Sequence, residues 1–333
     1  MRIAIVNDMP LAVEALRRAL AMEPAHQLIW VASNGAEAVA RCRENTPDVL
    51  LMDLMMPEMD GVEATRLIMS QTPCAILIVT VDMAQNVHRV FEAMGHGALD
   101  AVDTPALGSG RTQDAAALLR KIQNIGWLIG QGDSRRREAA KPVRTAKAQR
   151  LVAIGASAGG PATLATLLKQ LPASFSAAVV LVQHVDEVFA AGMAEWLASE
   201  SKLPVRLARD GEPPQPGTIL LAGTNNHIRI QRSGHLVYTA EPSSHVYRPS
   251  IDVFFDSVVA HWKGEAVGVL LTGMGRDGAQ GLKHMRDHGF RTIAQDRKSS
   301  AVYGMPKAAA ELDAAMEVLP LERIAPRLVE VFG

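Results

Sequence analysis

Cysteine is nearly absent from this sequence. Cys42 and Cys74 are its only two cysteines in 333 residues, and they form no C-x-x-C pair. A secreted scaffold held by disulfides needs an even set of spaced cysteines, so that class of protein is excluded. We interpret both residues as structural thiols of a protein that works in a reducing cytosol.

Charge of one sign and long apolar runs are also missing. The formal net charge is -1, so no basic field indicates a nucleic-acid partner. No apolar stretch reaches the ~18–20 residues that a membrane span needs. The first residues, Met1–Val6 followed by Asp8, lack the apolar core and cleavage site of a signal peptide. We therefore expect a cytoplasmic protein without direct membrane insertion.

What the sequence does contain is a regular alternation of short apolar runs and amphipathic stretches. Its 333 residues exceed one ordinary hydrophobic core and predict about two domains. Five strand–helix repeats occur in residues 1–122, which predicts an N-terminal (βα)5 domain with a parallel sheet covered on both faces. The expected strands are 3–6, 28–32, 49–52, 76–80 and 99–102, and the expected helices are 13–21, 36–44, 61–69, 87–94 and 113–122.

Residues 123–150 are predicted to be a basic linker. Between 131 and 150, seven basic side chains stand beside two acidic ones, and strong apolar residues are nearly absent. Such a segment cannot bury enough apolar surface to order itself, which favours a solvated tether over a nucleic-acid site.

From 151 to 333 the alternation returns and predicts a doubly wound parallel sheet. The expected strands are 151–155, 178–183, 218–221, 266–271 and 291–294, with a polar, hairpin-like stretch at 226–240. The expected helices are 160–170, 188–200, 250–260, 278–288, 305–313 and 321–332.

Polar residues end the strands of the first predicted domain. Asn7 and Asp8 close its first strand, Asp53 closes the third, and Thr80 closes the fourth. These strand ends meet in one crevice of a parallel sheet. Hard oxygen ligands there suit Mg²⁺ and phosphoryl transfer to a carboxylate. A lone aspartate would more simply cap the next helix, but this group, together with the turn Met-Pro-Glu-Met-Asp-Gly at 56–61, favours the phosphoryl-transfer interpretation.

In these residues the segment 1–122 resembles a response-regulator receiver domain. The resemblance implies that Asp53 is the phospho-acceptor and that Asp8, Asp53 and the Met55 carbonyl bind magnesium. It also implies that the Thr80 hydroxyl reports phosphorylation.

Two residues depart from the receiver pattern. Asn7 stands where the family usually has an aspartate, which lowers the negative charge of the site. Thr104 stands where receivers carry a lysine that pairs with the phosphoryl group, and a short neutral hydroxyl cannot supply that ion pair. We expect that Asp53 is still phosphorylated, but that its relay through Thr104 is altered or weakened.

Gly-Ala-Ser-Ala-Gly-Gly at 155–160 directly follows an apolar run. A strand that passes to a helix through such a turn exposes a serine hydroxyl near a helix N-terminus. By itself the turn could equally bind a phosphate or nothing. His184 ends the next predicted strand, where it could act as the base, and Asp277 follows a third, where it could orient the imidazole. Taken one at a time, each of these residues has a simpler interpretation as a structural residue. Together, Ser157, His184 and Asp277 predict one catalytic triad.

These motifs, with Val-Gln-His at 182–184 and Leu-Thr-Gly-Met-Gly-Arg-Asp-Gly-Ala at 271–279, resemble the CheB-type protein-glutamate methylesterases. Arg-Pro-Ser-Ile-Asp-Val at 248–253 and His227 fit the same family. The resemblance implies hydrolysis of glutamate γ-methyl esters on chemoreceptors, with release of methanol through a Ser157 acyl-enzyme. It also implies deamidation of receptor glutamines, an oxyanion site at the Met274 N–H, and no cofactor in the catalytic domain.

The same resemblance implies a methyl-accepting chemoreceptor and a CheA-type histidine kinase as partners. Within the family, Asn-Asp-Met-Pro at 7–10 and Val-Asp-Thr-Pro-Ala-Leu-Gly at 102–108 are similar to the Wsp-pathway branch, which feeds a diguanylate cyclase. We expect the unphosphorylated receiver to block the serine crevice and phosphorylation to open it. The alternative is a non-catalytic, phosphorylation-dependent scaffold of a chemosensory complex.

Overall fold

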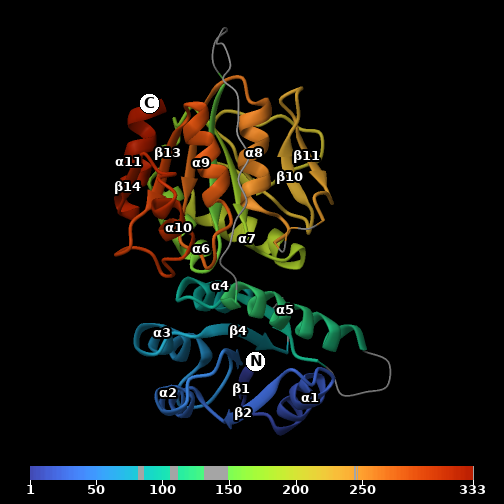
Figure 1. Cartoon of the computed structure of the whole chain (residues 1–333). Helices are drawn as coiled ribbons and strands as arrows, with labels where there is room; N and C mark the ends of the chain where they lie inside the picture. Colours follow the sequence, from blue (N-terminus) through green and yellow to red (C-terminus); the bar gives the residue numbers. More distant parts are fainter. Residues whose placement is uncertain (82–85, 106–111, 131–148, 244, 246, 333) are drawn as a thin grey trace. The chain divides into compact units, whose positions relative to one another are not determined.

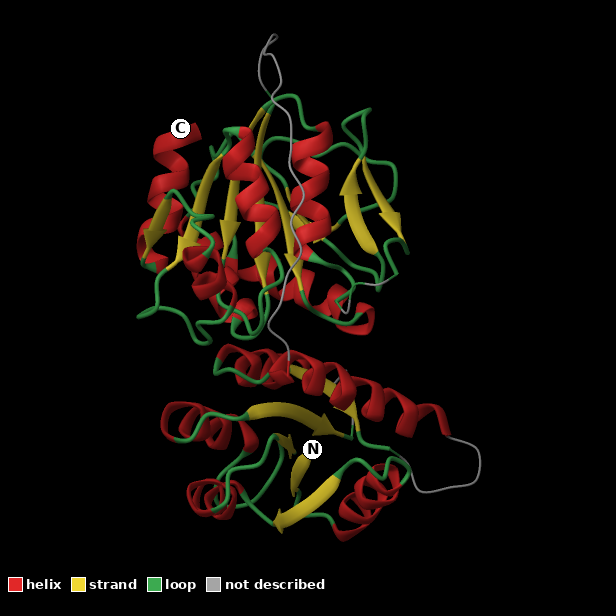
Figure 2. Cartoon of the chain, viewed as in Figure 1, coloured by secondary structure: helices red, strands yellow, loops and turns green. Residues whose placement is uncertain are grey.

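The chain folds into two compact units, Met1–Asp133 and Ser134–Gly333. The computed structural model describes residues 1–81, 86–105, 112–130, 149–243, 245 and 247–332. Each unit contains a parallel sheet between layers of helices (Figures 1 and 2).

The first unit has a five-stranded sheet in the order β2-β1-β3-β4-β5, and all its strand pairs are parallel. Helices α1 and α5 pack together, and α3 packs between α2 and α4. The strands are β1 Arg2–Val6, β2 Gln27–Ala32, β3 Val49–Met52, β4 Ala75–Thr80 and β5 Asp100–Asp103. The helices are α1 Pro10–Ala21, α2 Gly35–Glu44, α3 Gly61–Gln71, α4 Val87–Gly95 and α5 Thr112–Gly130.

The second unit has a seven-stranded sheet in the order β14-β13-β12-β6-β7-β9-β8, also parallel throughout. Its strands are β6 Arg150–Ala156, β7 Ala178–Gln183, β8 Val205–Leu207, β9 Ile219–Leu221, β12 Glu265–Leu270, β13 Arg291–Gln295 and β14 Glu317–Leu319. Its helices are α6 Gly160–Gln170, α7 Glu187–Glu200, α8 Ile251–His261, α9 Ala279–His288, α10 Met305–Glu311 and α11 Leu321–Phe332. A separate antiparallel hairpin is formed by β10 His227–Ile230 and β11 Leu236–Thr239.

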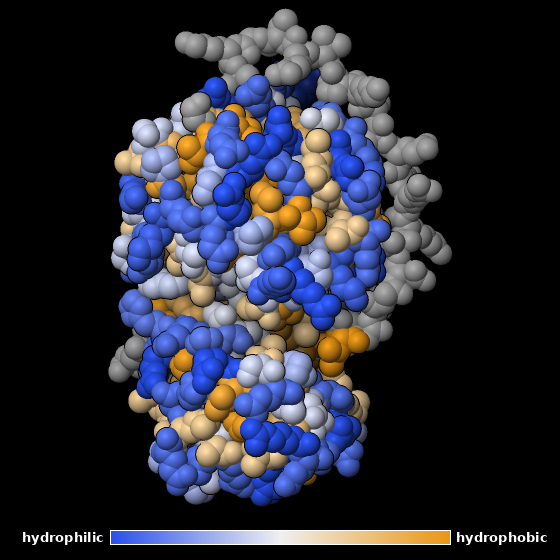
Figure 3. All heavy atoms as spheres, turned by 90° about the vertical axis from the view of Figure 1, so that its left-hand side faces the viewer, coloured by the Kyte–Doolittle hydropathy of each residue, from blue (hydrophilic) through white to orange (hydrophobic). Residues whose placement is uncertain are grey.

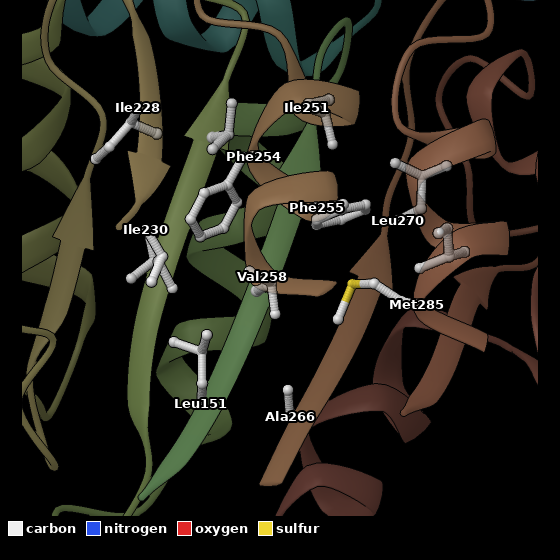
Figure 4. Close-up of a cluster of buried hydrophobic side chains, with 14 of the residues drawn as sticks. Leu151, Ile228, Ile230, Ile251, Phe254, Phe255, Val258, Ala266, Leu270 and Met285 are labelled. Atoms are coloured by element: carbon white, nitrogen blue, oxygen red, sulfur yellow. The ribbon is translucent and has the colours of Figure 1, made fainter. Parts of the chain in front are cut away.

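Helix α8 is fixed by one large apolar cluster of the second unit. Its residues Ile251, Phe254, Phe255 and Val258 recur at helical spacing and are fully buried. In Figure 4 they lie over the sheet, beside the hairpin residues Ile228 and Ile230, and all of these belong to one cluster (other members: Leu151, Ala266, Leu270 and Met285). This packing holds the N-terminus of α8 at a fixed place beside the sheet.

The predicted fold class is confirmed: an N-terminal (βα)5 unit precedes a doubly wound parallel-sheet unit. The sequence patterns missed β8 and β14, the two edge strands of the larger sheet, because each is short and contains a charged residue. The equally short β9 was found because its three residues form a continuous buried apolar run. Helix α5 continues to Gly130, so the predicted linker begins inside a helix. Linker residues 131–148 lie outside the described residues, and strand β6 already begins at Arg150, the last residue of the predicted linker. The limits proposed for the domains stay predictions.

The surface carries its hydrophobic residues in small separate groups among hydrophilic ones on the face seen in Figure 3. The most exposed large apolar side chains among the described residues include Leu11 and Val188, each 70% exposed. None of the helices in the described part of the chain is both long and apolar enough to cross a membrane.

Candidate active site

Three strand ends of the second unit bring together the predicted triad. Ser157 follows β6, His184 follows β7, and Asp277 lies in the turn between β12 and α9. Strands β12 and β7 flank β6 in the sheet, so all three residues lie at the same carboxyl edge. The strand order reverses around β6, which is the kind of position where open α/β sheets bind ligands.

The three side chains are connected in series. The Ser157 Oγ lies 3.1 Å from His184 Nδ1, and His184 Nε2 lies 2.8 Å from Asp277 Oδ2. A carboxylate can only accept, so Nε2 carries the proton and donates it to Asp277. The lone pair of Nδ1 then faces the serine hydroxyl and can accept its proton. The side chains of His184 and Asp277 are only 7% and 8% exposed, which shields this pair from water.

Close backbone packing sets the position of Ser157. Gly159 has φ 76°, a left-handed conformation that begins α6 and that other residues rarely adopt. A Cβ atom on Gly273 would lie 2.2 Å from Met305 Sδ and 2.8 Å from Ser157 Cβ, so only glycine fits there. The loop that begins at Thr272 can therefore lie directly against the serine.

Asp277 is held by the N-terminus of α8. Its Oδ2 accepts a hydrogen bond from the Ile251 N–H at 2.7 Å, and its Oδ1 accepts one from the Ser250 hydroxyl at 2.8 Å. Burial alone would raise the pKa of Asp277. The hydrogen bond from His184 and the electrostatic attraction of its ring, together with these donors, outweigh burial and lower the pKa to about 2. Asp277 is therefore ionised over the whole neutral range.

A network of buried polar side chains fixes the backbone around the triad. These side chains were not predicted from the sequence as part of the site. Gln183 Nε2 donates to the carbonyls of Ser157 and His184, at 3.0 and 3.2 Å. Thr272 Oγ1 donates to the Ala158 carbonyl at 2.9 Å, and Gln295 Oε1 accepts from the Thr272 N–H at 2.8 Å. The only signal for these residues is that each polar side chain ends or follows an apolar strand.

Tyr247 and Ser250 are two further residues that the sequence did not assign. The Tyr247 ring stacks on the His184 ring, with centroids 3.9 Å apart and planes 9° from parallel. Ser250 caps α8 and contacts Asp277. Both lie in or beside the segment 248–253, whose composition pointed to the family but not to these contacts.

Met274, the predicted oxyanion donor, directly follows Gly273 in the loop that contacts Ser157. Within the described part of the chain, its backbone N–H has no hydrogen-bond acceptor. This N–H is thus a donor beside the nucleophile that other backbone groups do not use. Its role as an oxyanion donor stays a prediction.

In the first unit, Asp53 is 5% exposed at the end of β3. Its Oδ2 accepts from Asn7 Nδ2 at 3.0 Å, and its Oδ1 accepts from the Leu54 N–H at 2.7 Å. Burial, the largest cause, and the charge of Asp8 raise the pKa of Asp53 to about 6, although the N–H groups of Leu54 and Met55 oppose them. A buried carboxylate that accommodates its charge poorly is one that a cation or a neutralising reaction would stabilise.

The other predicted residues of this site differ in their surroundings. Asp8 is exposed and Met55 is 52% exposed, whereas Thr80 is 2% exposed. The Thr104 N–H donates to the Thr80 carbonyl at 2.9 Å, so the two residues are adjacent. The Thr104 hydroxyl is buried and has no hydrogen-bond partner among the described residues. No cluster of three or more His, Cys, Asp or Glu side chains suited to a metal occurs in that part of the chain.

A serine, histidine and aspartate in series at a sheet edge define a serine hydrolase, here joined to a second α/β unit with a buried aspartate at the end of β3. The CheB methylesterase family matches residues 152–328, and the response regulator receiver domain matches residues 3–107. The chain belongs to the CheB methylesterase family and carries a receiver domain at its N-terminus.

The chain is similar to named proteins over its whole length. It is 78% identical over 334 residues to "Protein-glutamate methylesterase/protein-glutamine glutaminase 3" of Pseudomonas aeruginosa, covering 100% of both chains. It is 74% identical to a protein of the same name, numbered 1, of Pseudomonas fluorescens, covering 100% of this chain and 99% of the other. The crystal structure of the Thermotoga maritima CheB methylesterase catalytic domain matches with a TM-score of 0.53 and 33% identity, over 56% of this chain and 100% of that one.

Proposed function

We infer that this protein is a protein-glutamate methylesterase that hydrolyses glutamate γ-methyl esters on chemoreceptors. The observation that carries this proposal is the series Ser157 Oγ, His184 Nδ1 and Asp277 Oδ2, with contacts of 3.1 and 2.8 Å. Family membership supplies the substrate class, and the geometry supplies the chemistry.

In the first step, Ser157 Oγ attacks the γ-carbonyl carbon of the methylated glutamate. His184 Nδ1 takes the serine proton, and Asp277 stabilises the imidazolium that forms. The tetrahedral intermediate then breaks its bond to the methoxy group, which takes the proton from Nδ1 and leaves as methanol. The Met274 N–H is the donor we assign to the oxyanion.

In the second step, water attacks the acyl-enzyme. His184 Nδ1 takes a proton from the water, and the bond between the acyl carbon and Ser157 Oγ breaks. The serine recovers the proton, and the product is a glutamic acid side chain, which releases its carboxyl proton to the solvent. A receptor glutamine presents the same carbonyl, so the same steps release ammonia instead of methanol and give a glutaminase activity.

The receiver supplies control through Asp53, which we propose as the phospho-acceptor. The carboxylates of Asp8 and Asp53 and the Met55 carbonyl are hard oxygen donors of the kind that Mg²⁺ takes. The raised pKa of Asp53 fits a site that gains from a cation. When bound there, Mg²⁺ would neutralise charge during phosphoryl transfer. Asn7 adds an amide donor to Asp53 rather than a further negative charge.

Thr80 and Thr104 are the residues that we propose sense the phosphoryl group. The Thr104 N–H donates to the Thr80 carbonyl, so the two side chains start from adjacent positions at the same sheet edge. Thr104 carries no charge to pair with a phosphoryl oxygen, which supports a weakened relay. We propose that phosphorylation shifts a population of blocked molecules toward open ones.

We further propose a CheA-type histidine kinase as the phosphodonor, a methyl-accepting chemoreceptor as the substrate and the cytoplasm as the location. The Wsp-pathway branch remains our assignment within the family. It rests on the two short motifs at 7–10 and 102–108.

The test of the catalytic proposal is methanol release from a methylated chemoreceptor by the full chain and its Ser157→Ala variant. We expect a loss of about 10⁵-fold or more, with an unchanged circular dichroism spectrum. Glu195→Gln, on the exposed side of α7, serves as the control and should keep full activity. Equal methanol release by the wild type and Ser157→Ala would favour the scaffold alternative.

The test of control uses the same assay with acetyl phosphate and Mg²⁺. We expect the rate of the wild type to rise and that of Asp53→Asn to stay constant. A phosphodonor that leaves Asp53 unmodified by mass spectrometry would overturn its assignment as acceptor.

A further inference from the structure

His227 is a buried histidine for which the mechanism above has no use. It is the first residue of β10 and is 0% exposed. Its Nδ1 lies 3.1 Å from the Ser250 backbone nitrogen, and its Nε2 lies 3.2 Å from the Pro242 carbonyl oxygen. An N–H can only donate, so Nδ1 accepts from Ser250, and Nε2 carries the proton that it donates to Pro242. The ring is therefore a neutral imidazole in one tautomer.

Pro242 and Ser250 bound most of the segment that joins β11 to α8, and we name the part between them the 242–250 loop. Its residues 244 and 246 lie outside the described residues. One imidazole thus ties both ends of this loop to the hairpin. A third contact comes from His245 of the same loop, whose ring meets His227 edge-on at 5.7 Å between centroids.

The 242–250 loop contacts two of the three triad residues. Tyr247 stacks on His184 at 3.9 Å, and the Ser250 hydroxyl donates to Asp277 Oδ1 at 2.8 Å. The two nitrogen bonds of His184 fix its ring along the line between Ser157 and Asp277. They leave the ring free to tilt about that line, and a parallel ring in van der Waals contact blocks the tilt.

We propose that His227 is a positioning residue of the active site: its neutral ring holds both ends of the 242–250 loop, and this loop keeps His184 and Asp277 in line with Ser157. The proposal rests on the function proposed above and adds a role for the hairpin. Displacing a reacting group by about 1 Å can lower a rate by about 10²-fold, so a support of this kind is visible in kinetics.

The surroundings of His227 keep its ring neutral. Burial is the largest cause that lowers its pKa, and the charges of His245 and Arg248 act in the same direction. The Pro242 carbonyl and Asp277 oppose them, and the net direction is downward. The Nδ1 lone pair is therefore available to Ser250 at neutral pH.

Two variants of the full chain test the proposal. His227→Leu removes both hydrogen bonds, whereas His227→Asn keeps an oxygen near the position of Nδ1 for the Ser250 N–H and loses only the bond to the Pro242 carbonyl. With a peptide that carries a glutamate γ-methyl ester, we expect kcat to fall about 10²-fold in His227→Leu with KM within about twofold. His227→Asn should recover part of that loss.

A second readout is the rate at which a fluorophosphonate modifies Ser157, because this reaction needs the aligned serine and histidine but no receptor sequence. We expect it to fall in parallel with kcat. If the wild type reacts with the fluorophosphonate but does not hydrolyse the ester, the proposed substrate fails and the positioning role is still measured.

Substitution of Tyr247 tests the same proposal without changing the buried His227. Tyr247→Leu should lower kcat and the phosphonylation rate about tenfold, and Tyr247→Phe should retain both, because the stack needs only the ring. This pair answers the question even if His227→Leu does not fold.

The matched control is His288→Leu on α9, a partly buried histidine that contacts Phe290 and no triad residue. It should keep the wild-type kcat. The proposal is overturned if folded His227→Leu keeps wild-type rates, or if His227→Asn and Tyr247→Phe are as slow as the leucine variants.

Discussion

Asp277 and Asp53 are both buried carboxylates at the carboxyl edge of a parallel sheet, yet their pKa values shift in opposite directions. The pKa of Asp277 falls to about 2, and that of Asp53 rises to about 6. Burial raises both, so the partners decide the outcome. Asp277 has His184 and the donors of the α8 N-terminus, whereas Asp53 has fewer donors and the negative charge of Asp8 nearby.

The difference in pKa therefore reflects a carboxylate whose hydrogen-bond partners are all in place in one unit and a carboxylate with too few partners in the other. The triad carboxylate is fully supported before any substrate arrives, which is the condition for orienting a base. The receiver carboxylate and the Thr104 hydroxyl beside Thr80 are left incompletely paired in the described residues. Such a site gains from a cation or a phosphoryl group, which suits a switch.

Removing the charge of Asp277 should have the largest effect. In Asp277→Asn, an amide replaces the acceptor of the His184 proton, and the imidazole loses the tautomer that presents Nδ1 to Ser157. We expect kcat for methanol release to fall by about 10³–10⁴-fold, as expected for this role in a triad. A loss below tenfold, with the fold intact, would mean that Asp277 does not orient the base.

Removing the charge of Asp53 should instead stabilise the receiver. Its folded pKa lies above its unfolded value, so the folded state binds more protons between these values and stability falls as pH rises through about 4 to 6. Asp53→Asn should therefore gain about 3 kcal/mol at about pH 7.5 and much less at about pH 4.

Calorimetry of the full chain without Mg²⁺ measures this gain in the receiver transition. Glu92→Gln, on the exposed face of α4, is the control and should change little at either pH. A gain for Asp53→Asn that is equal at both pH values would show that the charge is not its source.

The smallest effect concerns two threonines of the receiver. Thr104→Val removes a buried hydroxyl without a described partner and should stabilise the receiver by about 1 kcal/mol. Thr65→Val removes a hydroxyl that donates to the Gly61 carbonyl at 2.6 Å and should destabilise it by a similar amount. Denaturant unfolding measures both, and shifts of the same sign would contradict the difference in pairing.

Much of the fold and the core of the site could be predicted from the sequence. The buried strands are continuous apolar runs, and Ser157, His184 and Asp53 follow them directly, so strand order alone brings them to the sheet edges. The short edge strands β8 and β14 could not be found, because each contains a charged residue and is only partly buried, whereas the equally short β9 is a continuous apolar run. Gln183 and Gln295 were missed because a glutamine after a strand does not reveal which carbonyl it will meet.

The sequence by itself determined which residues stand at the ends of the strands, because apolar runs, glycine turns and the polar residues that follow them are local properties of the chain. Only the tertiary structure decided how those residues are held. The α8 N-terminus that sets the pKa of Asp277, the tyrosine stacked on His184 and the histidine that ties the 242–250 loop all join distant parts of the chain. Their contacts exist only after the core has packed α8 and the hairpin against the sheet, and no local pattern encodes that packing.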